Sequence, residues 1–286
     1  VSTRKIEKLA KSLGIDSISR SQVSQITKEL NDQVQTFRTR PLKNIYPVLW
    51  VDALYEKIRY DHRVQNMAVA IVIGLDETGH RDVLAVEPMQ EGSKCTYKAV
   101  FEKLKQRGLE NAWLVVSDAH KGLVKAINES FLQCAWQRCK VHFMRNILAH
   151  IPAKKKAWFV GRLKQIWLQP DYDSAREYAH FFIESVGKSY PEATAVLEDG
   201  LEDSLQFYDF TPIDFRKIAS NNILERLNRE IRRQTTVVGI FPSMDSYIRL
   251  VTTYLIEYSE DWSMSHCYIK PDTLQQVQEK RQKSVA

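Results

Sequence analysis

Residues 48–54 read Val48-Leu-Trp-Val-Asp52-Ala-Leu54, a run of β-branched, aromatic and aliphatic residues with one aspartate inside it. This composition is typical of a buried β-strand. A buried carboxylate costs free energy unless it is paired or binds a metal ion. The stretch therefore predicts a core strand whose aspartate takes part in chemistry, although a turn residue or a helix cap is the simpler interpretation of any single aspartate.

The residues that follow predict a mixed α/β domain. Further strands are predicted at 67–74, 83–87, 113–116 and 134–136, and helices at 96–107 and 121–128. The first three strands have short connections, one of them the turn signal Asp76-Glu-Thr-Gly79, and predict an antiparallel meander. The order β-β-β-α-β-α-β is that of a mixed sheet with helices on both faces.

A second aspartate, Asp118, directly follows the apolar strand that ends in Ser117. The first and fourth strands of the predicted sheet are neighbours, and open α/β sheets place their sites at the strand ends. We therefore expect Asp52 and Asp118 to approach one point. Two nearby carboxylates repel each other, and a divalent cation relieves that repulsion. Oxygen ligands favour Mg²⁺ or Mn²⁺ over zinc.

A third carboxylate lies on a helix predicted at 219–232. One face of this helix gathers polar groups suited to metal and phosphate, namely Asn222, Glu225, Asn228 and Arg229. The opposite face is apolar and comprises Ile223, Leu224, Leu227 and Ile231. A solvated amphipathic helix with ordinary ion pairs is the alternative interpretation.

Charge is unevenly distributed along the chain, whose net charge is +6. Residues 1–45 hold nine basic and four acidic residues, residues 138–165 eight basic residues and no acid, and residues 216–233 six basic and two acidic. Residues 171–214 hold eleven acidic and two basic residues. Separate basic segments indicate a polyanion partner, with solvated helix faces as the alternative.

The first 45 residues predict a helix-turn-helix-like segment. Helices are expected at 2–13 and 19–37, joined by Gly-Ile-Asp. The second helix would present side chains that reach phosphates and base edges: Arg20, Ser21, Gln22, Ser24, Gln25 and Lys28. A plain amphipathic helical pair explains the same pattern.

Composition excludes several protein classes. A hydrophobic content of 44% over 286 residues is ordinary for a globular protein. The longest apolar run, Met67 to Leu75, is far short of the about 20 residues that a membrane span needs. Four Cys without a CxxC pair fit a reducing cytoplasm, so we expect a cytoplasmic protein. Because the first residue is Val, we expect the natural N-terminus to lie upstream.

Six segments carry a family resemblance: Val48–Arg59, Leu104–Leu109, Val116–Leu123, Gln137–Asn146, Asn222–Arg233 and Val237–Pro242. They occur in the order and approximate spacing of the bacterial Mutator-like insertion-sequence transposases, which the chain resembles from about residue 1 to about residue 268. The resemblance implies a ribonuclease-H-like catalytic domain with a DDE triad of Asp52, Asp118 and Glu225. These three residues would be catalytic and would bind Mg²⁺, for which Mn²⁺ can substitute.

The resemblance also implies a helical insertion domain between Asp118 and Glu225, where helices are predicted after Cys139 from sequence alone. The expected organisation is a helix-turn-helix-like DNA-binding segment (1–45), the first part of the catalytic domain (46–150), the insertion (151–215), the catalytic helices with the Glu (216–268) and a polar C-terminal tail (269–286) that frays from Leu274.

Other residues are assigned supporting or DNA-binding roles. Cys139-x-x-His142 matches an element of the family but supplies two of the four ligands of a structural zinc site, so a supporting role is favoured. His120, Asn222 and Asn228 are further supporting candidates. Candidate phosphate contacts are Arg226, Arg229, Arg232 and Arg233, in addition to the outward residues of the second helix.

The sequence thus predicts a DDE transposase of a bacterial insertion sequence. It would cut element ends and join them to target DNA by two-metal phosphodiester hydrolysis and transesterification. A homodimer on DNA is expected because two ends must be brought together, and neither a membrane nor a small-molecule cofactor is expected. The resemblance also implies a bacterial protein that associates with the nucleoid when it is bound to DNA. The alternatives are a truncated, non-catalytic DNA-binding remnant and a ribonuclease-H-like nuclease without strand transfer.

Overall fold

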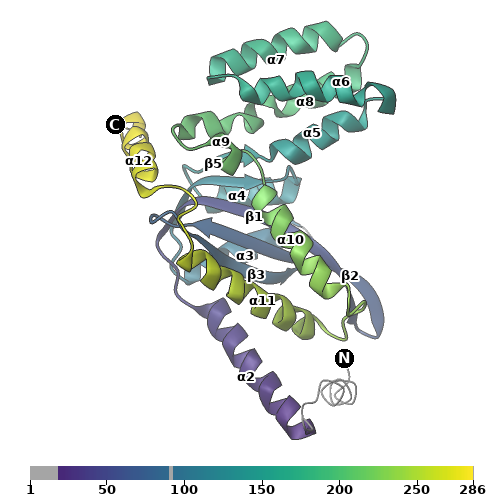
Figure 1. Ribbon diagram of the computed structural model, residues 1–286, viewed down its shortest axis with the longest axis vertical. Helices are drawn as coiled ribbons and strands as arrows, with labels where there is room; N and C mark the ends of the chain where they lie inside the picture. The colour runs from purple at the N-terminus through teal and green to yellow at the C-terminus, as the bar shows by residue number, and fades with distance from the viewer. Residues whose placement is uncertain (1–18, 90–92, 286) are drawn as a thin grey trace.

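The centre of the computed structural model, which describes residues 19–89 and 93–285, is a five-stranded mixed sheet with the strand order β3-β2-β1-β4-β5 (Figure 1). The strands are β1 (Ile45–Tyr60), β2 (Arg63–Leu75), β3 (Arg81–Met89), β4 (Asn111–Ser117) and β5 (Ala135–Arg138). The first three strands pair antiparallel, whereas β4 pairs parallel with β1, and β5 parallel with β4. The predicted meander and the mixed α/β class are confirmed, and the architecture is consistent with the ribonuclease-H-like class.

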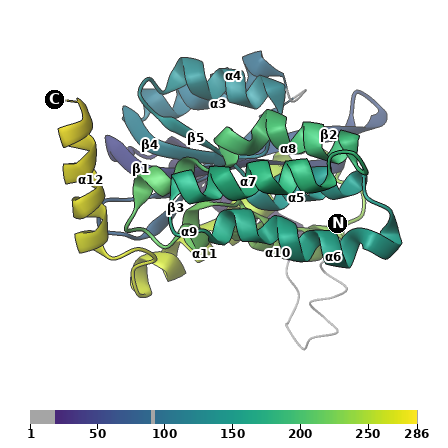
Figure 2. The same cartoon turned by 90° about the horizontal axis from the view of Figure 1, so that it is seen from above.

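Helices cover both faces of the sheet (Figure 2). One face is covered by α3 (Lys94–Gln106) and α4 (Lys121–Ser130), and the other by α10 (Asn222–Thr235) and α11 (Met244–Met264). A sheet buried on both faces explains why the strand segments of this sequence are almost continuously apolar.

The side chains of β1 alternate between two cores. Trp50 and Leu54 belong to the core on the side of α10 and α11, whereas Leu49 and Val51 belong to the core under α3 and α4. Because successive side chains of a strand point to opposite faces, Asp52 lies on the same face as Trp50 and Leu54. Strand periodicity therefore aims this carboxylate at α10.

A helical unit follows β5 and stands at one end of the sheet (Figure 1). It contains α5 (Lys140–Ala149), α6 (Ala153–Leu163), α7 (Tyr172–Val186), α8 (Pro191–Ser204), α9 (Phe215–Ile218) and the 3₁₀ turns η1 (Lys164–Leu168) and η2 (Gln206–Phe210). Phe159, Trp167 and Phe182 are buried in it. The predicted helical character of this stretch is confirmed, while the boundaries proposed for the insertion stay predictions.

Buried hydrogen bonds attach the helical unit to the sheet. The side chain of Gln137, on β5, is completely buried. Its Nε2 donates to the carbonyl oxygen of Ser204 (2.9 Å), and its Oε1 accepts from the backbone N–H of Phe207 (2.8 Å). One amide side chain thus bonds both α8 and the turn that follows it.

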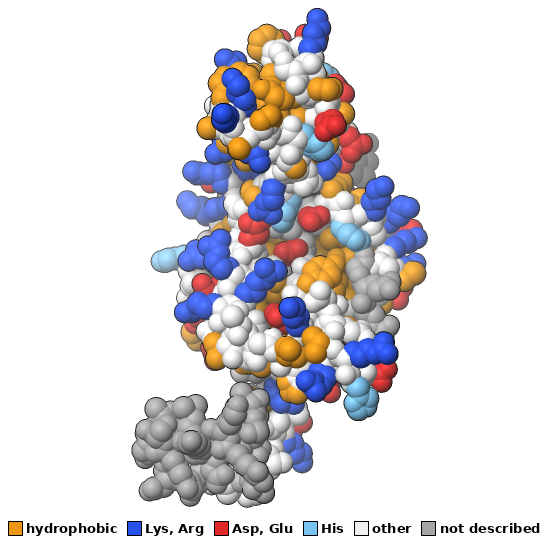
Figure 3. All heavy atoms as spheres, turned by 90° about the vertical axis from the view of Figure 1, so that its right-hand side faces the viewer, with side chains coloured by type: hydrophobic (Ala, Val, Ile, Leu, Met, Phe, Trp, Pro, Cys, Tyr) orange, Lys and Arg blue, Asp and Glu red, His pale blue; other side chains and the backbone are white. Residues whose placement is uncertain are grey.

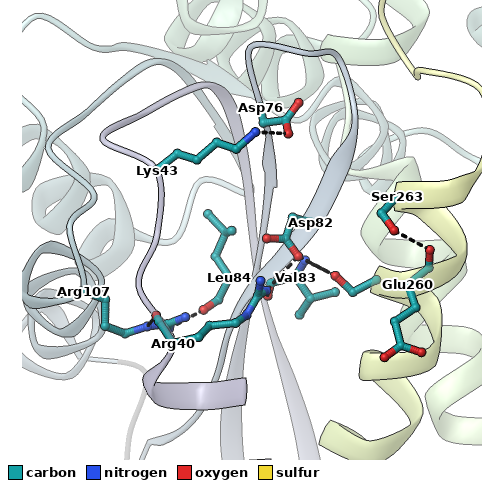
Figure 4. Close-up of polar contacts among 10 residues, drawn as sticks. Arg40, Lys43, Asp76, Asp82, Val83, Leu84, Arg107, Glu260 and Ser263 are labelled. Atoms are coloured by element: carbon teal, nitrogen blue, oxygen red, sulfur yellow. Dashed lines mark hydrogen bonds and ion pairs between the residues drawn. The ribbon is translucent and has the colours of Figure 1, made fainter. Parts of the chain in front are cut away.

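A polar network joins the end of α2 (Arg20–Thr39) to the sheet (Figure 4). Arg40 Nη2 donates to Asp82 Oδ1 (2.8 Å) and to the carbonyl oxygen of Val83 (2.9 Å). Arg107, after α3, donates through Nη1 to the carbonyl oxygen of Leu84 (2.6 Å) and through Nε to that of Arg40 (2.9 Å). These contacts hold the base of α2, while the rest of that helix projects away from the sheet (Figure 1).

Replacing Asp76 by Asn is expected to lower the free energy of unfolding at pH 7 by about 1–2 kcal/mol, a value kept small because Lys43 is half exposed. Asp76 accepts from Lys43 Nζ (2.6 Å), Thr78 Oγ1 (2.6 Å) and the backbone N–H of His80 (3.0 Å). Burial alone would raise the pKa of Asp76, but these hydrogen bonds outweigh it and hold the pKa below its usual value.

The contribution of Asp76 is therefore present above the unfolded-state pKa and is lost as the pH falls through the folded-state pKa. Thermal unfolding from pH 7 into acid should show the Asn variant converging on the unaltered protein. Glu77→Gln, an exposed neighbour in the same turn, is the matched control and should behave as the unaltered protein throughout. A destabilisation that persists unchanged in acid would contradict this account.

The expectation of a fraying C-terminal tail is wrong. Residues Pro271–Val285 form a helix, α12. Leu274 and Val277 are three residues apart, share one face of this helix and are buried in the core. The polar residues between them concealed a stripe too short to recognise in the sequence. None of the described helices combines the length and apolar character that crossing a membrane requires.

Candidate active site

Parallel pairing brings Asp52 and Asp118 to the same end of the sheet. Trp50 pairs with Val116, and the two aspartates come two residues later on each chain segment. Asp118 lies in the turn between β4 and α4, whereas Asp52 lies inside β1, which continues as a long hairpin with β2. The charge of Asp118 is felt at Asp52, whose pKa it raises.

The carboxylate of Asp52 is held by two hydrogen bonds. Its Oδ1 accepts from the backbone N–H of Ala53 (2.9 Å) and its Oδ2 from Asn228 Nδ2 (2.8 Å). Burial raises the pKa of Asp52 to about 6; the Ala53 N–H and His142 oppose the rise, and the charges of Asp118 and Glu225 add to it. Three carboxylates thus repel one another here, which is the electrostatic situation that a cation relieves.

Helix α10 is fixed along β1, and this places Glu225. Asn228 bonds Asp52, and two turns later Thr235 Oγ1 donates to Glu56 Oε2 (3.2 Å). The segment after the helix then adds to the end of β1, where the N–H of Phe241 donates to Lys57 (3.2 Å) and its carbonyl accepts from Arg59 (2.9 Å). This pairing is the structural role of the 237–242 segment.

Cationic side chains of α5 lie beside Glu225. His142 Nε2 is 3.3 Å and Arg145 Nη2 3.7 Å from Glu225 Oε1. Hydrogen bonding to the Cys139 side chain raises the pKa of His142 to about 9; burial opposes this rise, and the charges of Asp118 and Glu225 add to it. The Cys139-x-x-His142 element therefore lies at the carboxylates, and the raised pKa of His142 favours its protonated form there.

Asn221 is a site residue that sequence reasoning missed. It is completely buried, its Nδ2 donates to the carbonyl oxygen of Val51 (3.0 Å), and its backbone N–H donates to Cys139 Sγ (3.2 Å). It thus connects the start of α10 to β1 and α5. The available signal was the Asn-Asn pair just before a helix, a position that favours polar side chains.

The members of the predicted polar face of this helix have different surroundings in the structure. Asn228 and Glu225 face the carboxylate cluster, but Asn222 is exposed and lines a cavity on another side of α10. Arg229 is exposed as well. Successive helical residues turn by 100°, so packing against β1 selects some members of the face and leaves the others outside.

The remaining predicted residues lie around this cluster. His120 is exposed at the start of α4, with its ring 5.8 Å from that of Tyr97. The helix predicted over 2–13 and the Arg20 side chain lie outside the described residues. The other predicted DNA contacts are exposed: Ser21, Gln22, Gln25, Lys28, Arg226, Arg229, Arg232 and Arg233.

On the side that Figure 3 shows, acidic and histidine side chains lie near the middle of the face, with Lys and Arg side chains around them. A negative centre with a basic border suits a polyanion held over a cation site.

Comparison with known proteins decides the family. The model of the family described as "Transposase, Mutator family" matches residues 1–265. The chain belongs to this family. The resemblance inferred from the six segments is thereby confirmed.

Insertion-sequence transposases from several bacteria are similar to this Mutator family member. It is 38% identical over 276 residues to the transposase for insertion sequence element ISRM5 of Rhizobium meliloti. The aligned residues make up 96% of this chain and 69% of that protein. The chain is 40% identical over 271 residues to the transposase for insertion sequence element IS256 in transposon Tn4001 of Staphylococcus aureus (93% and 68%). Identity to the transposase for insertion sequence element IS1081 of Mycobacterium tuberculosis is 38% over 275 residues (96% and 66%).

The donor chemistry of this Mutator family transposase fits a hard cation. The cluster offers carboxylate oxygens, and among the described residues three buried oxygens near it have no hydrogen-bond partner: Glu225 Oε1, Asn221 Oδ1 and Asn228 Oδ1. Of these, Glu225 Oε1 keeps its ion-pair contacts with His142 and Arg145. Oxygen-rich sets of this kind suit Mg²⁺. Within residues 19–89 and 93–285, however, no three His, Cys, Asp or Glu side chains are grouped closely enough to hold an ion as they stand. The site therefore fits Mg²⁺ in the kind of donor atoms that it offers.

Proposed function

We propose that this chain is a DDE transposase that cuts the ends of its insertion sequence and joins them to target DNA. The observation that supports this most is the convergence of Asp52, Asp118 and Glu225, carried by β1, the β4–α4 turn and α10, in a family of transposases. Asp52, Asp118 and Glu225 would bind Mg²⁺. When bound, Mg²⁺ would supply Lewis-acid activation of the attacking oxygen and neutralise the leaving oxygen.

The protein side chains position the reacting groups. Asn228 and the Ala53 N–H orient the Asp52 carboxylate through their hydrogen bonds. His142 and Arg145 balance the charge of Glu225, so that the carboxylates can lie together before a cation and DNA arrive. Exposed arginines of α10 contact the phosphates next to the reacting one. Positioning and charge neutralisation are the main means by which proteins accelerate phosphoryl transfer.

The proposed reaction has two steps. Water attacks a phosphodiester at the element end, a P–O bond to the 3′ oxygen breaks, and a free 3′-hydroxyl results. That hydroxyl then attacks a phosphodiester of the target DNA, forms a new P–O bond and displaces the target's own 3′ oxygen. The two DNA substrates are thus the element end and the target. A homodimer would hold two element ends together.

A cleavage and joining assay tests this proposal. Duplex oligonucleotides carrying the element's own ends are incubated with the protein and a target plasmid, in Mg²⁺ or in EDTA. We expect nicked ends and joined products in Mg²⁺ alone. Cleavage without joined products would favour a nuclease, and binding without cleavage would favour a non-catalytic remnant.

Replacing Asn228 by Ala is expected to slow cleavage by about 10–100-fold and to raise the Mg²⁺ concentration needed for half-maximal rate. The reason is that Asp52 loses the side chain that orients its Oδ2. The measurement is the cleavage rate across a Mg²⁺ titration. Gln234→Ala, an exposed change on the same helix, serves as the control. An unchanged Mg²⁺ midpoint in Asn228→Ala would rule out the orienting role.

A further inference from the structure

A cavity of about 460 Å³ lies on the side of α10 away from the carboxylates. Its lining includes Arg81 from β3, Asn222 and Arg226 from α10, Tyr258 and Trp262 from α11, and Tyr268 from the segment before α12. This volume falls in the range of about 300–1,000 Å³ that is usual for small-molecule sites. Of its lining residues, the reaction proposed above uses only the exposed Arg226, as one of the phosphate contacts of α10.

The cavity holds two guanidinium groups that lack a carboxylate partner among the described residues. Arg81 stacks on two aromatic rings instead of forming an ion pair. Its Cζ lies 4.5 Å from the ring centroid of Trp262 and 4.6 Å from that of Tyr268. Burial lowers the pKa of Arg81; Tyr268 opposes this shift, and the charge of Arg226 adds to it. The lining acid, Glu230, is bonded to Arg233 (2.9 Å). The cavity therefore favours an anion.

Its walls are aromatic and held in place. Tyr258 and Trp262 line the cavity from α11, four residues apart, with ring centroids separated by 5.9 Å. Tyr254, one turn earlier and outside the lining, packs against Tyr258 with a centroid separation of 5.0 Å. Tyr268 is fixed by its backbone, which donates to the carbonyl of Gly79 (2.7 Å) and accepts from Lys217 Nζ (2.5 Å). Flat aromatic surfaces beside guanidinium groups match a ligand that has both a π-face and a phosphate.

We propose that this cavity binds one unstacked nucleotide of a DNA strand, with its phosphate between Arg81 and Arg226. Its base would stack on Trp262 and meet Tyr258 edge-on, because the planes of these two rings are 79° apart. Base–aromatic stacking combined with basic groups is how proteins bind single-stranded nucleic acid without sequence preference. The inference rests on the proposed function, because it takes DNA as the ligand.

The position of the cavity suits a strand that also reaches the carboxylates. Glu225 and Arg226 are consecutive residues of α10, so the two sites lie on different sides of one helix whose diameter with side chains is about 10–12 Å. A nucleotide near the reacting phosphodiester could therefore leave the duplex and enter the cavity. Such a contact would hold open the DNA end while its phosphodiester reacts.

Binding of single-stranded DNA in EDTA tests the proposal independently of cleavage. The probe is a fluorescein-labelled oligo-dT of about 12 nucleotides, and the readout is anisotropy. Trp262→Leu is expected to weaken affinity about 10-fold, the loss of one base stack, and Trp262→Phe to restore most of it. Arg226→Ala, an exposed change, should weaken affinity and reduce the salt dependence by about one phosphate contact. Phe181→Leu removes an exposed aromatic residue of α7 and should change nothing.

A second readout locates the base. An oligonucleotide with 5-iodo-deoxyuridine in place of thymidine should cross-link, on irradiation, to the α11 peptide that contains Tyr258 and Trp262. Unchanged affinity of folded Trp262→Leu, cross-links confined to other peptides, or no oligonucleotide binding by the unaltered chain would each overturn the proposal. Cleavage by Glu225→Gln would instead overturn the proposed catalytic set and leave the cavity result intact.

Discussion

Glu225→Gln is expected to abolish Mg²⁺-dependent cleavage and joining, with a rate loss of at least about 10³-fold, while the affinity for element ends stays unchanged. Glutamine keeps the shape of the side chain but removes the charge that would bind the cation. The neighbouring cations, His142 and Arg145, would then lie beside a neutral amide. The measurements are single-turnover cleavage of end oligonucleotides and a parallel binding titration in EDTA.

The matched control for this result is Glu198→Gln on α8, which removes the same charge from an exposed position. It should cleave at the rate of the unaltered protein. Equal activity of Glu225→Gln and Glu198→Gln would exclude Glu225 as a metal ligand. Loss of DNA binding in Glu225→Gln would point to a folding defect, which circular dichroism would reveal.

Gln137→Ala is expected to destabilise the protein by about 2–4 kcal/mol, which for a chain of this size lowers the Tm by about 3–7 °C. The change leaves the carbonyl of Ser204 and the N–H of Phe207 buried without their side-chain partner. It also opens a cavity at the junction of β5 with α8. Thermal unfolding followed by circular dichroism measures the effect.

Gln165→Ala, an exposed glutamine of η1, is the control for this loss of an amide and should shift the Tm by less than about 2 °C. The destabilised variant should also cleave DNA more slowly at temperatures well below its Tm, because α5 belongs to the helical unit and carries His142. A Tm equal to that of the unaltered protein would show that apolar packing alone attaches the helical unit to the sheet.

The sheet was predictable because its strands are local patterns. Each of the first three strands is an apolar run bounded by turn residues, and short connections leave antiparallel pairing as the natural arrangement. The exact ends of the strands were harder to predict. β1 continues to Tyr60 through alternating exposed residues, because the long hairpin with β2 supplies the hydrogen bonds that those residues alone do not indicate.

The C-terminal part of α11 shows a different limit. The helix continues to Met264. Polar residues around Trp262 hid the repeat of Tyr254, Tyr258 and Trp262, whose spacing is helical and could have been used. The repeat becomes part of a cavity only because Arg81, far away in sequence on β3, stacks on Trp262.

The sequence by itself determined the class of fold, the family and the three carboxylates as candidates, since these follow from local composition and from motifs in a set order. Tertiary structure alone decided which neighbours those carboxylates have. The pairing of β1 with β4, the docking of α10 along β1 and the burial of Asn221 join residues more than 60 positions apart, and no local pattern encodes such distances. Long-range contacts depend on how whole surfaces pack, and that packing divided the polar residues of α10 between a carboxylate cluster and a separate aromatic cavity.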